Sequence, residues 1–424
     1  MVQLPIVYSR RDLTLATMGL RMRIAQVCFQ RYPSPTHVGG GDVRRWQDLC
    51  SLRALGHGVD VIVCDPTNER TPELDRIASS VAVLHSEEMR PGTPRWLASR
   101  VFNPSSLALA YPDLRGLQRS VSAVVDRIRP DLIWAEEAFA VLLCPEGVPI
   151  VHSHLDFHFK LRSVRSRSFA SRRLRRPQAI SAQRLQELEV DVCRRCAHTM
   201  CASSSEAEFL RGLGISASYL PVTGPTTPEP DYGRLSKGRL FLFGNPNTAM
   251  RAARHDLKSN IWPEIERLGL ELQWHQLGKK PRKGSDPSWK WLEEHFVVHG
   301  FVHDLDDVFS PGDASIMPYP FDTGGRAKFA VSAGYGVVNI AYEKTFACSN
   351  EFTHRVDCLA AHNPSHFAEL LGEFVSDDSL RLRLAEGSRA VYERHFTMEA
   401  SYPRYERILD VATSSGSEAA KCAS

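Results

Sequence analysis

The chain alternates short apolar runs with longer segments whose apolar residues recur every three or four positions. The short runs have the length and composition of buried parallel strands, and the longer segments have the spacing of amphipathic helices. In the first half the pattern predicts helices at 43–55, 117–128 and 183–196 and strands at 24–29, 59–64, 81–85, 132–135, 149–153, 198–202 and 218–221. Such alternation is typical of βαβ units built on a parallel sheet.

A second alternating series follows residues 223–233, which are dense in proline and glycine and lack periodicity, as inter-domain linkers do. Beyond them the pattern predicts helices at 257–268, 328–333, 366–374, 380–395 and 398–411 and strands at 239–243, 272–277, 296–298, 314–317, 337–341 and 357–360. We therefore expect an α/β protein of two Rossmann-like domains that face a cleft. Ligands of such domains bind outside the carboxyl ends of the strands.

Length, composition and net charge restrict the class of protein that this chain can be. A chain of 424 residues is long enough for two domains, and 43% apolar with 24% charged residues is typical of a globular protein. The sequence has no run of about eighteen apolar residues, the length that a membrane-spanning helix needs. The net charge of +3 gives no overall case for nucleic acid, and we expect no such partner.

The ten cysteines favour a reducing compartment. Several lie inside apolar runs, where a free thiol packs as a small hydrophobe, and the chain is too long for a secreted disulfide framework. We interpret Cys193 and Cys196 as core residues, because no second pair with metal-ligand spacing lies nearby. Residues 1–21 lack the apolar core of a signal peptide, and we expect a disordered extension there. A cytoplasmic location follows.

A glycine run follows the first predicted strand. Gly39, Gly40 and Gly41 lie between that strand and the next predicted helix. Consecutive glycines let the backbone approach a ligand closely, and the N–H groups at a helix N-terminus favour anions. A plain strand-to-helix turn is the alternative, but it needs one glycine rather than three. The run therefore favours a ligand-binding loop.

Several motifs, in their order, resemble the GT-B glycosyltransferases, particularly the retaining family-4-like group (glycosyl transferases group 1). The glycine run is followed by a helix and Leu-Gly-His-Gly-Val at 55–59, and Ser203, Ser204 and Ser205 follow a later strand. Phe-Leu-Phe-Gly-Asn at 241–245, Val-His-Gly-Phe-Val-His-Asp-Leu at 298–305 and Asp-Ala-Ser-Ile-Met-Pro at 313–318 come next. The resemblance covers about 22–411.

The resemblance implies an order of domains along the chain. It places an acceptor-side domain at 22–223, a linker at 224–238 and a nucleotide-sugar-binding domain at 239–395. A helix at 396–412 then returns to the first domain, and a polar tail occupies 413–424.

A second glycine pair, Gly324 and Gly325, precedes a predicted helix with Arg326 and Lys328 in its first turn. Cations at a helix N-terminus are electrostatically unfavourable for the helix itself. A bound diphosphate would make their interaction favourable, because the N–H dipoles and both cations would converge on it. The alternative is that both are solvated surface charges. In the family a basic residue at this place clamps the diphosphate, and Lys328 matches it by position.

The resemblance also implies a basic residue early in the second domain, after Gly244. Arg251, Arg254 and Lys258 are the candidates, since the family's usual R-x4-K-G pattern is absent. Spacing cannot decide among them. We favour Arg254 and keep Lys258 beside it as a diphosphate-binding residue.

One departure concerns two glutamates that many retaining members carry eight residues apart, the first beside the sugar and the second on the ribose. Aligned on the glycines, these positions are Thr323 and Val331, which offer no carboxylate. Asp322 adjoins the first and is the candidate to substitute for it. The ribose contact has no counterpart, so donor affinity, donor choice or turnover is in question.

Three histidines and an aspartate follow the strand at 149–153. His152, His154, Asp156 and His158 are residue types that suit zinc or iron, but an extended segment would place them on one face without closing a ligand set, and helical spacing also fits His154 and His158. We expect no metal. The resemblance implies that His154 lies over the donor sugar with Asp156 beside it, near the acceptor oxygen.

Eight basic residues lie within 160–176, interleaved with apolar ones. If helical, this basic run suits an anionic membrane surface, at the inner face of the membrane, or an acceptor that carries phosphates. The alternative is a solvated helix or loop beside the cleft.

The primary expectation is a glycosyltransferase that moves a sugar from a nucleoside-diphosphate sugar to a glycan, lipid or small-molecule acceptor. The resemblance implies retention, and no metal or cofactor because Arg and Lys neutralise the diphosphate. One alternative is a sugar-nucleotide-binding protein or partner subunit without turnover, motivated by the missing glutamates. Another is a sugar-nucleotide epimerase, which would convert the donor without an acceptor.

Overall fold

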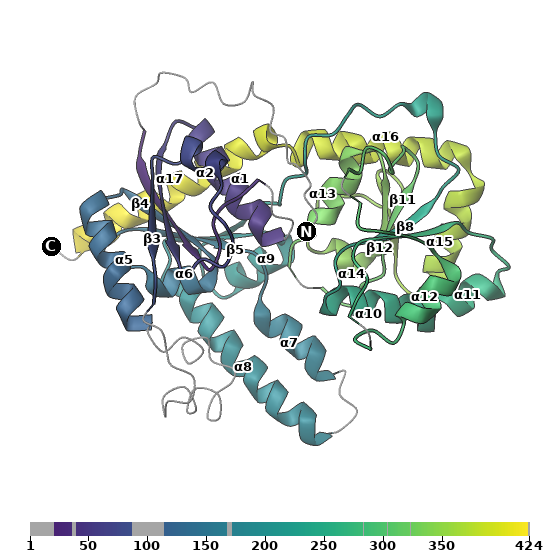
Figure 1. The fold of residues 1–424 in the computed structure, drawn as a ribbon, viewed down its shortest axis with the longest axis horizontal. Coiled ribbons are helices and arrows are strands. Elements are labelled where there is room, and N and C mark those ends of the chain that lie inside the picture. Colours follow the sequence, from purple (N-terminus) through teal and green to yellow (C-terminus); the bar gives the residue numbers. More distant parts are fainter. Residues whose placement is uncertain are drawn as a thin grey trace.

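The computed structural model describes residues 21–35, 40–86, 114–167, 172–282, 284–302, 304–322 and 324–422. The chain forms two lobes, each built around its own parallel sheet with helices on both faces (Figure 1). The prediction of an α/β fold with two Rossmann-like halves is confirmed.

The first sheet has the strand order β3-β2-β1-β4-β5-β6-β7. Its central strands are buried along their whole length, because helices cover both faces of a parallel sheet. In register, Ile24 pairs with Val59 on one side and with Leu132 on the other. The strands are β1 (Arg23–Phe29), β2 (Gly58–Cys64), β3 (Ser80–Leu84), β4 (Leu132–Glu136), β5 (Ile150–His154), β6 (His198–Cys201) and β7 (Ala217–Tyr219).

Helices of the first lobe include a pair, α7 and α8, that packs together and projects away from the sheet (Figure 1). The sequence predicted only the second half of α8, because arginines dominate the first half and leave little apolar periodicity. The helices are α1 (Gly40–Ala54), α2 (Pro72–Ile77), α5 (Leu114–Ile128), α6 (Glu137–Leu143), α7 (His158–Arg167), α8 (Arg172–Arg194) and α9 (Ser204–Gly212).

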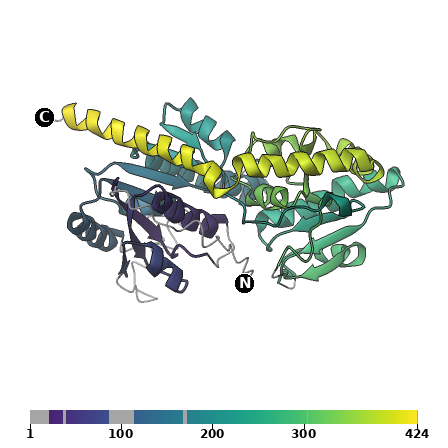
Figure 2. The same cartoon turned by 90° about the horizontal axis from the view of Figure 1, so that it is seen from above.

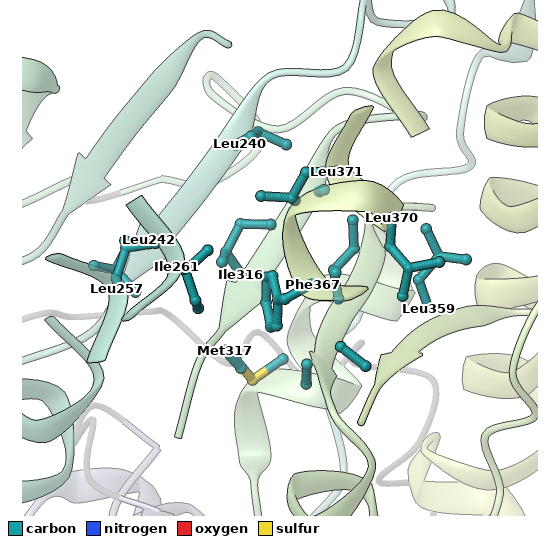
Figure 3. Close-up of a cluster of buried hydrophobic side chains, with 14 of the residues drawn as sticks. Leu240, Leu242, Leu257, Ile261, Ile316, Met317, Leu359, Phe367, Leu370 and Leu371 are labelled. Carbon is teal, nitrogen blue, oxygen red and sulfur yellow. The ribbon is translucent and has the colours of Figure 1, made fainter. Parts of the chain in front are cut away.

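The second sheet has the order β10-β9-β8-β11-β12-β13, with β8 (Leu240–Phe243), β9 (Trp274–Leu277), β10 (Val297–Gly300), β11 (Ala314–Met317), β12 (Val338–Tyr342) and β13 (Cys358–Ala361). Its core joins aliphatic residues of the strands to those of the covering helices (Figure 3). The helical segments are η2 (Tyr232–Arg234), α10 (Thr248–Asp256), the π-helical η3 (Leu257–Ile261), α11 (Trp262–Arg267), α12 (Trp289–His295), α13 (Ala327–Gly334), α14 (Glu343–Phe346), α15 (Pro364–Ser376) and α16 (Asp378–His395).

The last helix, α17 (Met398–Cys422), leaves the second lobe and lies along the first (Figure 2). Tyr405 is fully buried there, stacks on Trp134 of β4 at 5.6 Å and donates its hydroxyl proton to the buried Asp48 of α1. This contact ties the end of the chain to the first core. The segment 413–424, expected as a polar tail, continues the helix as far as Cys422.

The cysteines and the helix lengths bear on two expectations from the sequence. The nine cysteines whose side chains are described are free thiols, and burial raises the pKa of Cys193 to about 12. No helix within the described ranges combines the length and apolarity that crossing a bilayer requires.

The strand order reverses once in each sheet, between β1 and β4 in the first and between β8 and β11 in the second. At such a switch point the helices that follow the two strands lie on opposite faces, so a crevice opens at the carboxyl ends of the strands. We call these places the first and second switch points. The two lobes are in direct contact: Ser204 donates its backbone N–H to the carbonyl of Cys348 at 3.0 Å and its hydroxyl to that of Ala347 at 2.8 Å.

Candidate functional site

At the second switch point, Lys328 of α13 reaches back to the end of β8. Its Nζ donates to the Tyr319 hydroxyl at 2.8 Å and lies 2.9 Å from the sulfur of Met250. Gly244 has φ +140°, where other residues are strained, and a side chain there would collide with the end of Lys328. The glycine therefore leaves room for the lysine at the strand end.

Two arginines are close enough to influence the charge state of this lysine. Burial lowers the pKa of Lys328, and the charges of Arg326 and Arg254 lower it further, although Tyr319 acts in the opposite direction. Burial alone would raise the pKa of Tyr319, but these three cations outweigh it and the pKa is lowered. Arg326 also lies over the Tyr319 ring, with its Cζ 4.5 Å from the centroid. Three cations thus converge on one place, which an anion would stabilise.

Arg254 is fixed by Asp286, and one of its buried nitrogens lacks a hydrogen-bond partner within the part of the chain that the structure describes. Its side chain is 1% exposed, and its Nε donates to Asp286 at 2.6 Å. Its Nη1 is buried and has no hydrogen-bond partner among the described residues. Lys258 is not brought to this place: it is exposed, with its Nζ over the Trp291 ring at 6.0 Å.

The glycine pair before α13 packs against the first lobe. Gly324 has φ +56°, and a side chain there would overlap the Asp156 carboxylate. A Cβ on Gly325 would come within 2.5 Å of the Ala202 carbonyl oxygen. The pair was expected to cradle a diphosphate; here its lack of side chains lets the two lobes touch. Thr323 and Gly39 lie outside the described residues.

On the first lobe, His154 ends β5 and faces a buried carboxylate that the sequence analysis did not single out. Glu206, in the first turn of α9, is fully buried, with Oε2 3.3 Å from His154 Nε2 and Oε1 3.3 Å from Lys160 Nζ. Its Oε1 also accepts the backbone N–H of Gly324 at 3.2 Å. Burial raises the pKa of Glu206, but His154 and Lys160 more than compensate, so the pKa is lowered.

Asp322, the candidate substitute for the missing glutamate, crosses from the second lobe into this network. Its Oδ2 accepts the Ser205 hydroxyl at 2.8 Å and lies 3.4 Å from Lys160 Nζ. Its Oδ1 is buried without a hydrogen-bond partner among the residues that the structure describes. One carboxylate oxygen is therefore fixed by the first lobe, and the other is unsatisfied.

Asp156 lies in the turn after β5, against Gly324. Burial raises the pKa of this carboxyl from 3.8 to about 6, and the negative charge of Glu206 raises it too, while Arg326 and His154 act against the rise. Arg326 is therefore close enough for its charge to act on Asp156, so the cation cluster adjoins the first-lobe carboxylates. At neutral pH the carboxyl is mostly ionised and able to accept a proton.

Gly41, near the start of α1, lies over the same turn. A side chain at Gly41 would come within 3.0 Å of Leu155 and 3.3 Å of both Arg45 and Glu137. Gly40 is the first residue of the helix. A cavity of about 170 Å³ lies beside Gly41, lined also by Glu137, Ala138, His154, Leu155, Asp156, His158 and Glu189.

The histidines in and after β5 do not form a set of metal ligands, although the rings of His152 and His154 meet edge to face at 5.3 Å. His152 is buried beside Cys193, with Nδ1 3.7 Å from the thiol, and burial lowers its pKa well below the usual value. His158 begins α7 and lies 3.3 Å from Glu189, whose hydrogen bond raises the pKa of the imidazole. No group of three potential metal ligands forms among the described residues.

Sequence reasoning missed Glu206, Lys160 and Tyr319. Glu206 stands three residues after the helix cap Ser203, where a glutamate ordinarily reads as a capping residue. Lys160 was counted with the basic run, so its separate contact with Glu206 was not predicted. Val331, at the position of the family's ribose glutamate, packs in an apolar cluster with Phe241. No carboxylate replaces it at that position.

Solved structures with the same arrangement of two sheets are known, although no protein-family model and no curated protein matches the sequence. Among solved structures, sucrose-phosphate synthase from Thermosynechococcus elongatus is 14% identical, with a TM-score of 0.64 over 92% of this chain and 98% of that chain. Anabaena HepE in complex with UDP is 13% identical, with a TM-score of 0.59 over 92% and 100%. S. aureus TarM, in a complex that includes UDP, is 6% identical, with a TM-score of 0.61 over 92% and 99%.

The chain has the GT-B fold. In a GT-B protein two Rossmann-like domains present the carboxyl ends of their strands to one cleft. In this chain, Asp322 and the glycine pair before α13 contact the first lobe beside His154 and Asp156. The expectation drawn from the sequence motifs is confirmed for the fold. The identities are too low to carry an activity from the neighbours to this chain.

Proposed function

We propose that the protein is a glycosyltransferase that uses a nucleoside-diphosphate sugar, with a uridine nucleotide as the first donor to examine. The observation that carries the proposal is the cluster of Lys328, Arg326 and Arg254 at the second switch point, with an unsatisfied buried Nη1 on Arg254. A diphosphate would supply an acceptor for Arg254 Nη1 and negative charge beside all three cations. HepE, a structural neighbour, has been solved with UDP and with UDP-glucose.

The first lobe supplies the groups around the reacting carbon. The bond between the sugar C1 and the diphosphate breaks, and a bond forms between C1 and an acceptor hydroxyl oxygen. We propose that the acceptor proton passes to the departing phosphate, with retention at C1, and that His154 and Asp156 orient the acceptor hydroxyl. Glu206 holds His154 and Lys160 in place.

We further propose that the three cations neutralise the departing diphosphate, so that the reaction needs no metal ion or other cofactor. Asp322 would take over part of the role of the family's first glutamate, which lies beside the sugar. Its fixed Oδ2 and unsatisfied Oδ1 support a contact with the donor sugar. The ribose lacks a carboxylate partner at Val331, and we expect a weak donor affinity relative to proteins that have one.

A thermal-shift screen with UDP, GDP, ADP and their sugars tests the proposal, because a ligand that binds the folded state raises its midpoint. Mass spectrometry of the best donor, incubated with and without a mixture of acceptors, then follows the sugar. Transfer that requires an acceptor is the expected result. Binding without turnover would favour the non-catalytic alternative, and donor conversion without an acceptor would favour an epimerase. No shift with any nucleotide would refute all three.

We also propose a cytoplasmic protein whose basic run contacts anionic lipid. The free thiols support a reducing compartment. The α7–α8 pair, on whose sequence the basic run lies, projects from the first lobe (Figure 1). Sedimentation with phosphatidylglycerol vesicles at low salt, but not with phosphatidylcholine vesicles, is the expected result. Equal binding to both vesicles, or to neither, would contradict the lipid contact.

A further inference from the structure

A second cavity lies at the first switch point, away from the cation cluster. It has a volume of about 370 Å³, within the range of about 300–1,000 Å³ that is common for small-molecule sites. Residues that directly follow β1 and β4 form its walls, as the switch-point rule predicts. The lining consists of Phe29, Gln30, Arg31, Gly41, Asp42, Arg45, Glu137, Phe139 and His158.

Two phenylalanines give this cavity a flat apolar wall. Phe29 and Phe139 stack with ring centroids 5.0 Å apart and planes 18° from parallel. Phe139 remains partly exposed. The face of an aromatic ring carries partial negative charge, and the C–H groups on one face of a pyranose carry partial positive charge. The wall therefore matches the apolar face of a sugar.

The charged groups of the cavity neutralise one another. Arg45 Nη2 lies 2.5 Å from Glu137, and Arg45 Nη1 lies 3.2 Å from Asp42, which also pairs with Arg31 at 3.4 Å. Two guanidinium groups thus face two carboxylates, in contrast with the three cations of the second switch point. A phosphate would have to compete with both carboxylates. A neutral ligand with several hydroxyl groups could donate to the carboxylates and accept from the guanidinium groups.

The backbone at this cavity is held in an unusual conformation. Glu137, the first residue of α6, has φ +69°, a region that non-glycine residues seldom occupy. Gln30, which follows β1 on the opposite wall, has φ +61°. Such a strained backbone conformation is costly and is found most often at functional sites. Here it directs the Glu137 carboxylate, whose side chain is 35% exposed, to Arg45 at the cavity wall.

This cavity leads to the place of transfer. Gly41, Glu137 and His158 line both it and the smaller cavity of about 170 Å³ that contains His154 and Asp156. The two cavities therefore adjoin at the carboxyl edge of the first sheet, and we call them together the groove. A ligand with one ring on Phe139 could extend a second ring to His154.

We infer that this groove binds the acceptor and that the acceptor is an uncharged carbohydrate with at least two rings. The inference rests on the proposed function for the direction of transfer, but the binding of a neutral glycan is independent of it. Glu137 and Arg45 would select the hydroxyl pattern of one ring, and Phe139 would support the apolar face of that ring.

An array of immobilised neutral, phosphorylated and sulfated glycans tests the inference with the full chain. We expect binding to a subset of neutral glycans, weakened at least tenfold by Glu137→Gln, which keeps the side-chain size, and by Phe139→Leu. The matched control is Phe159→Leu: Phe159 packs on Phe157 in the same lobe, with centroids 5.1 Å apart, and does not line the groove. Thermal midpoints confirm that each variant is folded.

Binding of UDP, measured on the same proteins, separates this inference from the proposed function. Neutral glycan binding without UDP binding would refute the transferase and leave the glycan site standing. Binding to phosphorylated or sulfated glycans alone, no binding to any neutral glycan, or equal binding by Glu137→Gln, Phe139→Leu and the parent protein would overturn the inference.

Discussion

The two switch points have the same topology but different electrostatics. At the second, the charges of Lys328, Arg326 and Arg254 act on one another, and Asp286 pairs with Arg254. At the first, Arg45 and Arg31 are matched by Glu137 and Asp42. Strand order provides a crevice in both halves, but the side chains at the strand ends determine which part of a substrate each crevice suits.

Between the two switch points lies a set of carboxylates whose charges depend on their neighbours. Glu206 is fully buried and its pKa is lowered because His154 and Lys160 compensate the burial, whereas the pKa of Asp156 rises to about 6 because burial and Glu206 dominate. Two adjacent acids therefore differ in proton affinity. This separation is typical of sites that use one carboxyl as a fixed charge and another to exchange a proton.

The largest expected effect comes from Glu206→Ala. Removing this carboxylate takes the fully buried partner from Lys160 and His154 and leaves Lys160, among the described residues, only the partly exposed Asp322. We expect a loss of about 3–5 kcal/mol in the free energy of unfolding. Urea denaturation measures the loss. Glu208→Ala, an exposed position on the same helix, is the control and should change stability by less than about 0.5 kcal/mol. Equal losses in the two variants would show that Glu206 is not the centre of the first-lobe network.

Lys328→Ala tests the second switch point. We expect the dissociation constant for UDP to rise by roughly 10- to 150-fold, equivalent to about 1.5–3 kcal/mol for one charge-assisted hydrogen bond. The affinity for uridine, which has no phosphate, should be nearly unchanged. Isothermal titration of both ligands checks the difference. Parallel weakening of UDP and uridine would mean that Lys328 supports the fold of the site and not the diphosphate.

The raised pKa of Asp156 predicts a pH dependence of stability. The folded state holds this proton more tightly than the unfolded chain, so the free energy of unfolding falls as the pH rises from 3.8 to about 6 and stays lower above it. Asp156→Asn removes the charge, and we expect it to stabilise the protein at pH 7.5 by about 1–2 kcal/mol after allowance for partial exposure. Urea denaturation of both proteins from pH 4 to pH 8 gives the difference profile. A flat profile would contradict the raised pKa.

The smallest expected effect is that of Lys258→Ala. This lysine was a candidate for the diphosphate site, but it is exposed over Trp291. We expect UDP affinity and stability to change by less than about 0.5 kcal/mol, as at an ordinary surface position. A loss of UDP binding comparable to that of Lys328→Ala, in the same titration, would move the diphosphate away from the switch point.

The sequence predicted the fold well because hydrophobic periodicity encodes buried parallel strands directly. The strands at 24–29 and 59–64 match β1 and β2 to within one residue. The α7–α8 pair was largely missed for the opposite reason, since its first half is rich in arginine. Local pattern therefore predicts elements that face the core and fails for elements that face away from it.

The candidate site was predicted less completely, because its contacts join residues far apart in the chain. His154, Asp156, Asp322 and Lys328 could be found from their positions after strands or in a helix turn. Glu206 could not, since its partners lie on other elements and a glutamate three residues after a serine cap has a local explanation. The glycine pair 324–325 was assigned to diphosphate binding from the helix that follows it, and nothing in the local sequence indicated that the first lobe packs against the pair.

A crystal structure of the protein with UDP tests the central claim most directly. The account predicts the diphosphate at the second switch point, with phosphate oxygens within hydrogen-bond distance of Lys328 and of Arg254 Nη1. Phosphates bound instead beside Arg31 and Arg45 at the first switch point would contradict the division of the cleft into a diphosphate side and a neutral side.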